Sequence, residues 1–296
     1  MTITPTRDET RLDLTPLSGT IGSEIRGVDL SRPLSDEEVA AIRAVLLERK
    51  VVFFPGQHLD ADQHIAFAQA FGEVTEAHPV IPGIESHPEV FEIDYSEAGR
   101  LYDYYGDISN RARGIAWHTD VTFVERPPLG SILNAVVIPP AGGDTLFSDQ
   151  QAAYEGLSES LRSYLDTLTA VHDGQAQFGP LLKRFEQGEW EGETFRALEP
   201  VEHPVVRTHP ETGRKALFVN PGFTSHIKGL NRPESDALLA FLYQHATRDE
   251  YVVRYHWHAG DLGFWDNRVT QHAVSGDFGD QPRVIQRITL RGDTPV

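Results

Sequence analysis

The chain has 296 residues, of which 40% are hydrophobic and 24% are charged, a composition typical of a globular protein with one large domain or two small ones. Its formal net charge of -18 argues against nucleic acid or an anionic membrane as a partner, because both require a basic surface. The absence of cysteine excludes disulfides, thiolate nucleophiles and zinc–thiolate sites.

The start of the chain carries no visible targeting signal. Residues 1–5 lack the basic region and the following apolar region of a secretory signal. No apolar run in the chain approaches the roughly 18 residues that a transmembrane helix needs. We therefore expect a soluble, cytoplasmic protein.

The first half of the chain predicts two capped helices among short strands. After an N-terminal arm over residues 1–22, Ser35 and Glu38 form a capping box that starts the first helix. Asp60 is placed to cap the second helix, which extends to about Phe71. A short buried strand is expected over residues 51–54, and further strands over residues 90–94, 117–123, 130–138 and 145–147.

The second half predicts a run of strands after further helices. Two short helical pieces follow residue 147, the second starting at Ser158, and a helix is expected from Pro233 to His245. A hairpin is expected over residues 204–219, and strands over residues 251–257, 261–265, 270–275 and 284–290. Two polar segments look like insertions: residues 95–113, with Tyr102, Tyr104 and Tyr105, as a candidate lid, and residues 172–198 as an excursion over the surface.

Many short strands with few helices are typical of a β-barrel or a double-sheet jelly roll. We therefore expect a mainly β protein with helical cover, built on a double-stranded β-helix (jelly-roll) core. The chain shows no internal repeat and no linker, so residues 1–296 are expected to form a single domain.

His118 and Asp120 are the first candidates for a metal site. In an extended strand, side chains two residues apart point to the same face. An imidazole and a carboxylate there supply two of the three protein ligands of a mononuclear non-haem iron(II) site. The same spacing recurs at His58/Asp60, His87/Glu89 and His209/Glu211. Asp60 is explained as a helix cap, and the 209/211 pair lies in the turn of the predicted hairpin.

The last predicted strand brings two arginines to one face. Alternation places Arg283 and Arg287 on the same side, together with Ile285 and Thr289. Burying guanidinium groups is costly unless an anion compensates them, and their planar fork suits carboxylates and sulfonates. Pairing with nearby carboxylates, or exposure to water, is the alternative. His272 lies eleven residues before Arg283 on the preceding strand, so a third metal ligand can lie near an anion seat.

Six segments carry a family resemblance, and they occur in order at residues 117–123, 142–147, 203–210, 219–224, 265–272 and 283–287. On these segments the sequence resembles the taurine/2,4-D dioxygenase family of iron(II)- and 2-oxoglutarate-dependent oxygenases. The similarity covers most of the chain from about residue 20, and within the family it is greatest to the taurine dioxygenases.

The resemblance implies a role for each matching residue. His118, Asp120 and His272 would bind iron(II), and Thr145 with Arg283 would hold the distal carboxylate of 2-oxoglutarate. The sulfonate-binding residues of the taurine enzymes match His78 and Arg287, and the aromatic walls of their substrate pocket match Phe178 and Phe223. O2 would be the second cosubstrate, and a homodimer or homotetramer is expected. The histidines at 172, 203, 226, 256 and 258 are expected to be structural or solvated.

Two departures from the taurine enzymes concern the substrate. Ile81 replaces a tyrosine and Gly114 replaces an asparagine, which makes the expected pocket more apolar. We expect taurine or another alkylsulfonate to be converted to sulfite, an aldehyde, succinate and CO2. An alkyl sulfate or an aryloxyalkanoate is the alternative substrate. A non-catalytic barrel that binds a metal or an anion is the alternative of another class, and a zinc hydrolase is disfavoured because no general base is evident.

Overall fold

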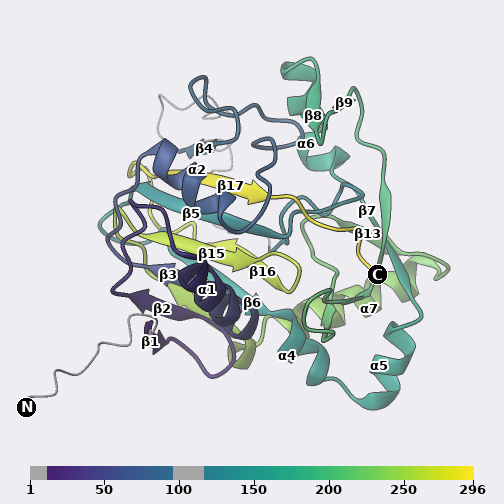
Figure 1. The fold of residues 1–296 in the computed structure, drawn as a ribbon. Coiled ribbons are helices and arrows are strands. Elements are labelled where there is room, and N and C mark those ends of the chain that lie inside the picture. The colour runs from purple at the N-terminus through teal and green to yellow at the C-terminus, as the bar shows by residue number, and fades with distance from the viewer. Residues whose placement is uncertain (1–11, 96–116) are drawn as a thin grey trace, which may run out of the picture.

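The computed structural model describes residues 12–95 and 117–296, and its largest feature is a seven-stranded sheet (Figure 1). In spatial order the strands are β1 (Asp13–Pro16), β2 (Ser23–Arg26), β3 (Val51–Phe54), β15 (Leu262–Asp266), β5 (Gly130–Val137), β17 (Val284–Leu290) and β4 (Phe91–Asp94). β2 and β3 are parallel, and the other neighbours are antiparallel.

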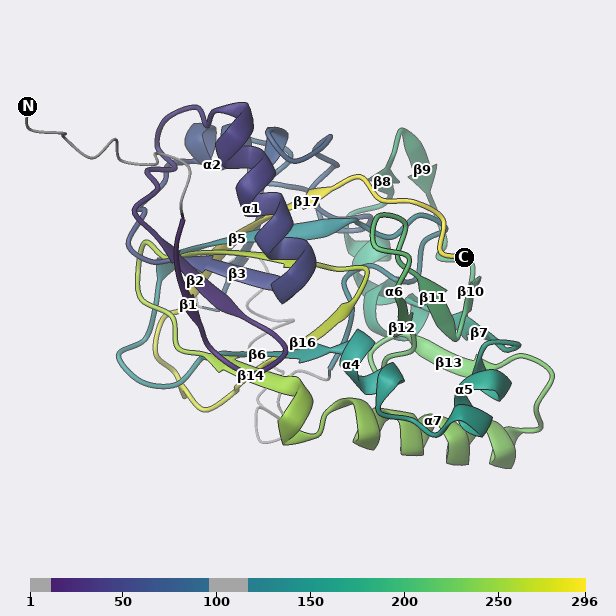
Figure 2. The same cartoon turned by 60° about the horizontal axis from the view of Figure 1, so that its bottom comes forward.

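A second, three-stranded sheet faces the first across an apolar layer (Figure 2). It consists of β14 (Val252–Tyr255), β6 (Thr145–Asp149) and β16 (Thr270–Val274), paired antiparallel. The layer between the sheets includes Phe53, Phe147 and Trp265, all buried. The protein is therefore mainly β, as expected, with two facing sheets, whereas the jelly-roll core stays a prediction.

Helices α1 (Asp36–Arg49) and α2 (Ala61–Gln69) cover the outer face of the large sheet (Figures 1 and 2). Both predicted caps are confirmed, since the side chains of Ser35 and Asp60 each accept a backbone N–H from the third residue of the helix. Strand β3 is apolar throughout because it is covered on both faces. Val52 and Phe54 pack with the helices, whereas Val51 and Phe53 pack between the sheets.

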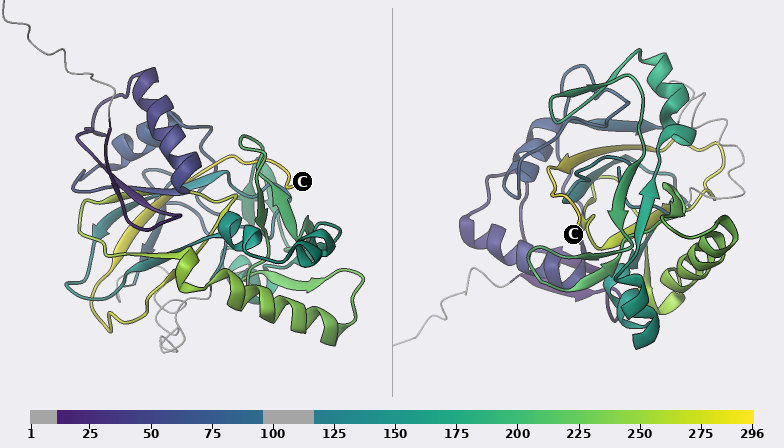
Figure 3. Two further views of the ribbon diagram at one scale, coloured as in Figure 1. Left: turned by 90° about the horizontal axis from the view of Figure 1, so that it is seen from below. Right: turned by 90° about the vertical axis from the view of Figure 1, so that its right-hand side faces the viewer.

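The remaining elements form a separate layer of helices and short strands around a third apolar cluster. A three-stranded sheet contains β10 (Val201–Pro204), β7 (Thr169–His172) and β13 (Thr224–Ile227), and the predicted hairpin is β11 (Val206–Thr208) with β12 (Lys215–Leu217). The helices are α4 (Gln150–Glu155), α5 (Glu159–Leu165) and α7 (Arg232–Ala246), with a 3-10 turn at Asp249–Tyr251. α7 lies on the opposite side of the molecule from α1 (Figure 3).

Two expectations are corrected. Residues 117–123 do not form a strand: His118 makes one isolated bridge to His272, and the chain then turns, with φ of 55° at Val121. Residues 172–198 are more than a surface excursion. They form α6 (Gln175–Arg184) and the hairpin β8 (Gly188–Trp190) and β9 (Glu193–Phe195), and they bury Phe178 and Trp190. The other predicted insertion, with its three tyrosines, lies outside the described residues from residue 96 onward, as does Gly114.

No helix in the described parts of the chain is both long enough and apolar enough to cross a membrane.

Two buried histidines predict acid sensitivity of the fold. His64 donates from Nε2 to the carbonyl of Ile132 at 3.1 Å, and burial lowers the pKa of both His64 and His203 to about 4. Between about pH 6.5 and pH 4 the unfolded chain, with histidine pKa values near 6.5, therefore binds protons that these two histidines do not bind in the folded protein. Stability should fall as the pH drops from about 6.5 towards 4, by on the order of 2 kcal/mol per buried histidine between pH 7 and pH 5.

Urea unfolding at pH 7 and at pH 5 measures this loss. His64→Gln keeps a donor towards Ile132 but cannot titrate, so its stability should depend less on pH than that of the wild type. An equal dependence in the two proteins would contradict the role of His64.

Candidate active site and metal centre

The three predicted metal ligands converge in the structure although they come from distant parts of the chain. His118 Nε2 lies 3.7 Å from Asp120 Oδ1, and His272 Nε2 lies 4.0 Å from the same oxygen. One ligand atom from each of the three residues lies within 4.8 Å of the others. Two atoms bound to one ion at about 2.1 Å can be up to roughly 4.2 Å apart, so small adjustments would let this set hold a metal. Two imidazoles and one carboxylate are the ligand set of a non-haem iron(II) centre.

A reciprocal backbone pair brings the two imidazoles together. The His118 N–H donates to the His272 carbonyl at 3.0 Å, and the His272 N–H donates to the His118 carbonyl at 2.8 Å. The ring centroids are consequently 4.2 Å apart. After this single bridge the turn at Val121 directs Asp120 to the same point. The ligands therefore converge through one bridge and a turn, not through the expected strand.

The carboxylate of Asp120 is 2% exposed and is held at both oxygens. Ser131 donates to Oδ2 at 2.7 Å, and the guanidinium of Arg287 contacts Oδ1. Burial alone would raise the pKa of Asp120, but Arg287, followed by the two histidines, lowers this pKa below its usual range. The group therefore stays ionised at neutral pH, as a metal ligand must.

His272 is prepared as a neutral ligand. Burial, reinforced by His118, lowers the pKa of His272 to about 3. Its imidazole consequently offers a lone pair at neutral pH without first losing a proton.

The main chain of Asp120 is held by Asn267, a contact that the sequence did not predict. Asn267 Oδ1 accepts the Asp120 N–H at 2.9 Å, and Asn267 Nδ2 donates to the carbonyls of Asp120 at 3.0 Å and Pro128 at 3.1 Å. Asn267 is buried, so these bonds are shielded from water. It thus fixes where the ligand-bearing turn lies relative to the large sheet.

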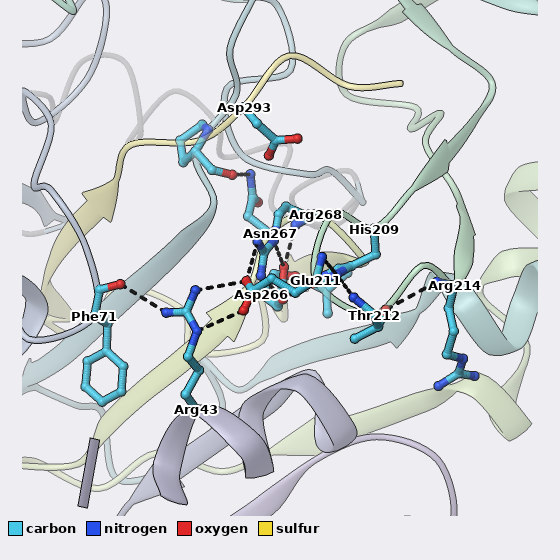
Figure 4. Close-up of polar contacts among 12 residues, drawn as sticks. Arg43, Phe71, His209, Glu211, Thr212, Arg214, Asp266, Asn267, Arg268 and Asp293 are labelled. Carbon is cyan, nitrogen blue, oxygen red and sulfur yellow. Dashed lines mark hydrogen bonds and ion pairs between the residues drawn. The ribbon is translucent and has the colours of Figure 1, made fainter. Parts of the chain in front are cut away.

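Asn267 is itself flanked by an ionic cluster that extends from buried Asp266 and Arg268 towards the surface (Figure 4). Arg268 pairs with Asp266 at 2.7 Å and with Glu211 at 2.8 Å, and Glu211 also pairs with Arg43 of α1 at 2.9 Å. His209 Nε2 lies 3.0 Å from Asp266 Oδ2. His209 and Glu211 do lie in the predicted turn, but their side chains link it to the end of β15 and the following turn, which carries Asn267. They are more than turn residues.

Gly222 allows the chain to approach His118 closely. A Cβ at this position would lie 2.8 Å from the Cβ of His118 and 3.2 Å from Asn220 Oδ1. Asn220 also donates to the hydroxyl of Thr122 at 3.1 Å, within the ligand-bearing turn. The turn around Gly222 therefore presses against the metal site and requires a residue without a side chain.

The predicted histidines at 172 and 203 support the same turn. His172 Nδ1 lies 2.9 Å from the hydroxyl of Thr122, and His203 Nε2 lies 3.0 Å from the carbonyls of Thr122 and Val124. They are structural, as expected. His256 and His258 are exposed, as expected, but they follow β14, which ends at Tyr255, and do not lie on the strand.

Arg283 is fully buried with two nitrogens that lack a partner. Its Nε donates to the carbonyl of Gly143 at 3.2 Å, whereas Nη1 and Nη2 have no hydrogen-bond partner among the described residues. The guanidinium lies beside the rings of Tyr95 and Phe278. A buried cation with free donors fits an anionic ligand such as a carboxylate.

Thr145 offers a second donor for an anion. Its hydroxyl accepts the indole N–H of Trp257 at 2.9 Å, which leaves the hydroxyl proton available for another acceptor. Thr145 lines the cavity at the metal set, and Tyr95, which contacts Arg283, lines it too. Trp257 orients Thr145. The sequence did not predict this contact, because a tryptophan in a strand with alternating apolar residues is typical of the hydrophobic core.

The predicted substrate residues surround one cavity of about 90 Å³ at the metal set. Its lining includes His78, Arg287, Phe178 and Phe223, together with the three candidate ligands and Thr145. His78 Nδ1 accepts the N–H groups of Val80 at 3.1 Å and Ile81 at 3.3 Å, so the ring proton sits on Nε2. Burial, followed by Arg287, lowers the pKa of His78 to about 3. His78 therefore acts as a neutral donor.

Comparison with known proteins gives a consistent result. The sequence model of the taurine catabolism dioxygenase TauD, TfdA family matches residues 13–289. The chain is 42% identical to an alpha-ketoglutarate-dependent sulfate ester dioxygenase of Pseudomonas putida, covering 96% of this chain and 91% of the relative. It is 40% identical to an alkylsulfatase of Acinetobacter baylyi, covering 96% and 86%. A crystal structure of a taurine dioxygenase from Burkholderia xenovorans is 44% identical, with a TM-score of 0.79 over 96% of this chain and 91% of that one.

Gly222 provides a test of how the metal ligands are positioned. Gly222→Ala should weaken iron(II) binding about 10- to 100-fold, because the added methyl displaces His118. Gly19→Ala is the matched control, since a Cβ at Gly19 meets nothing within 4 Å. Anaerobic iron(II) titration measures the affinity, and Asp120→Ala should abolish binding at one site per chain. If Gly222→Ala binds iron(II) like Gly19→Ala, Gly222 does not position His118.

Proposed function

The chain belongs to the taurine catabolism dioxygenase TauD, TfdA family and is a 2-oxoglutarate-dependent dioxygenase that uses iron(II) and O2, and we propose that its substrate is an alkyl sulfate ester. Family membership excludes the alternative of a non-catalytic barrel. The observation that supports this substrate is a cavity that combines two buried donors for an anion, His78 and Arg287, with apolar walls beside the metal set.

Separate sets of residues bind the two anions, 2-oxoglutarate and the sulfate ester. Arg283 and Thr145 hold the distal carboxylate of 2-oxoglutarate through donors that the fold leaves free. His118, Asp120 and His272 hold iron(II). When bound, the iron with its cosubstrates supplies the oxidation, in which one oxygen atom enters a substrate C–H bond and the other enters succinate, with release of CO2. Arg287 and His78 orient the anionic head so that the adjacent carbon faces the metal.

Hydroxylation next to the sulfate group leads to cleavage. The hydroxylated carbon then carries both a hydroxyl and the sulfate oxygen. The C–O bond to sulfate breaks, the hydroxyl loses its proton, and the products are an aldehyde and hydrogen sulfate. The same sequence on a sulfonate would break the C–S bond and release sulfite, so the two substrate classes differ in the inorganic product.

The apolar cavity favours an alkyl chain over the ammonium group of taurine. Among the described residues that line the cavity, Asp120 is the one that carries a carboxylate, and this carboxylate is a proposed metal ligand. The position of the expected tyrosine is taken by Ile81, which is buried among apolar residues. An ammonium group would therefore be desolvated without a counter-ion. Taurine and other sulfonates are the second candidates, favoured by the similarity to a taurine dioxygenase. Cytoplasmic location, homo-oligomeric assembly and a single domain remain predictions.

The role of Arg283 is testable on cosubstrate affinity. Arg283→Leu should weaken 2-oxoglutarate binding by roughly 2–5 kcal/mol, because the cosubstrate carboxylate would be left buried without its cation. Anaerobic titration of the iron(II) protein, followed by the metal-to-ligand charge-transfer band, measures the affinity. Arg291→Leu removes an exposed arginine that pairs with Glu73, and it should bind like the wild type. Equal affinities in all three proteins would exclude this role.

The substrate class is testable through the products. We expect a series of alkyl sulfates to give succinate and sulfate at a higher rate than taurine gives succinate and sulfite. Arg287→Gln should raise the KM for the sulfate ester, and iron(II) titration of the variant tests whether its contact with Asp120 also supports the metal. A clear preference for taurine would contradict the sulfate ester, and an unchanged KM would remove Arg287 from the anion seat.

A further inference from the structure

A second cavity, of about 210 Å³, shares no lining residue with the active-site cavity among the described residues. It is bounded by residues 123–126, by the β8–β9 hairpin and by residues 197–201. Its buried walls are apolar and include Val124, Trp190 and Leu198. Nothing in the proposed reaction uses this space.

Phe123 lies between the aromatic wall of the active-site cavity and the second cavity. Its ring lies 5.3 Å from the ring of Phe178 and 4.9 Å from that of Phe223, measured between centroids. Phe178 and Phe223 line the active-site cavity, and Phe123 lines the second one. Two layers of aromatic side chains therefore stand between the space at the metal and the second cavity, with Phe178 and Phe223 on the active-site side and Phe123 behind them.

The fold holds Phe123 in place. A Cβ on Gly174 would lie 2.7 Å from Phe123 Cγ, so the chain packs directly against the ring. The neighbouring carbonyls of Thr122 and Val124 each lie 3.0 Å from His203 Nε2, which anchors the backbone on both sides. Phe123 is therefore a fixed support for Phe178 and Phe223, and a long substrate cannot push these rings back without disturbing its contacts.

The charges around the second cavity select what could enter it. Its lining carries four carboxylates, on Glu125, Glu191, Glu193 and Glu199. Arg126, the one arginine among the described lining residues, pairs with Glu191 at 2.6 Å. This acidic boundary repels an anionic head group, which has its seat at Arg287 and His78. An uncharged apolar tail meets no such repulsion.

We propose that Phe123 determines substrate specificity by limiting tail length, because it holds Phe178 and Phe223 in place, and that the cavity behind it is a subsite for the alkyl tail which these rings close off from the metal centre. This inference rests on the proposed function, because it needs a substrate with an anionic head and an apolar tail. A tail that ends before Phe178 and Phe223 fits the active-site cavity, whereas a longer one collides with these rings, which Phe123 keeps from moving towards the second cavity.

The test compares chain lengths in the iron(II) enzyme with 2-oxoglutarate. Straight-chain sulfates from butyl to dodecyl are assayed for kcat/KM through succinate and sulfate release. In Phe123→Ala the ratio of kcat/KM for the dodecyl ester to that for the butyl ester should rise at least tenfold over the wild type. Phe123→Leu, which keeps more of the packing, should shift the ratio in the same direction by less.

Two further variants control for loosened packing. Phe185→Ala removes the same atoms from the same apolar cluster, but Phe185 borders neither cavity, so the ratio should stay at the wild-type value. Ala197→Phe fills the second cavity from its exposed side. Combined with Phe123→Ala it should return the ratio towards the wild type, while 2-oxoglutarate affinity stays unchanged.

The outcomes separate this inference from the proposed function. If the wild type turns over no alkyl sulfate, the proposed substrate class is wrong. If it turns over alkyl sulfates but both Phe123 variants keep the wild-type ratio, Phe123 does not limit tail length. A rise in Phe185→Ala equal to that in Phe123→Ala would likewise overturn the inference, because general loosening would then explain the change. A rise confined to the Phe123 variants and reversed by Ala197→Phe supports it.

Discussion

The active site depends on keeping one carboxylate ionised in a place from which water is excluded. Asp120 loses hydration on burial, and the fold compensates with the hydroxyl of Ser131, the guanidinium of Arg287 and two imidazoles. Asn267 fixes the main chain at the same residue. Because the compensating groups come from β5, β16 and β17, both facing sheets must be in register before the carboxylate can be held.

The distribution of charge follows from the same constraint. The chain is strongly acidic, yet Arg287 of β17 and Arg283, the residue just before this strand, are both buried where few carboxylates are available to pair with them. The unpaired donors of Arg283 and the shared guanidinium of Arg287 make anions the natural ligands of this interior. The negative surface does not oppose binding at these sites, since surface charges are screened by salt over about 8–10 Å.

Segment 172–198 links the metal site to substrate choice. It contributes Phe178 to the wall of the active-site cavity and Trp190 to the wall of the cavity behind Phe123. Its helix and hairpin pack onto the ligand-bearing turn through a shared aromatic cluster. A change in this segment can therefore alter the space for a substrate tail without replacing a metal ligand or a residue of the cosubstrate seat, all of which lie outside it.

Local patterns in the sequence determined the helix caps at Ser35 and Asp60 and the strand β3, which is buried on both faces. They also determined the inward face of β17 and the residue types of the metal set. Each of these features depends on neighbours a few positions apart in the chain. Only the tertiary structure decided how His118 and Asp120 converge, since a bridge to a strand about 150 residues away replaces the expected strand. The supports at Ser131, Asn267, Trp257 and Gly222, and the ionic cluster behind His209, were likewise decided by tertiary contacts. Such contacts join residues far apart in the chain, and no local periodicity encodes which of many buried polar groups will meet.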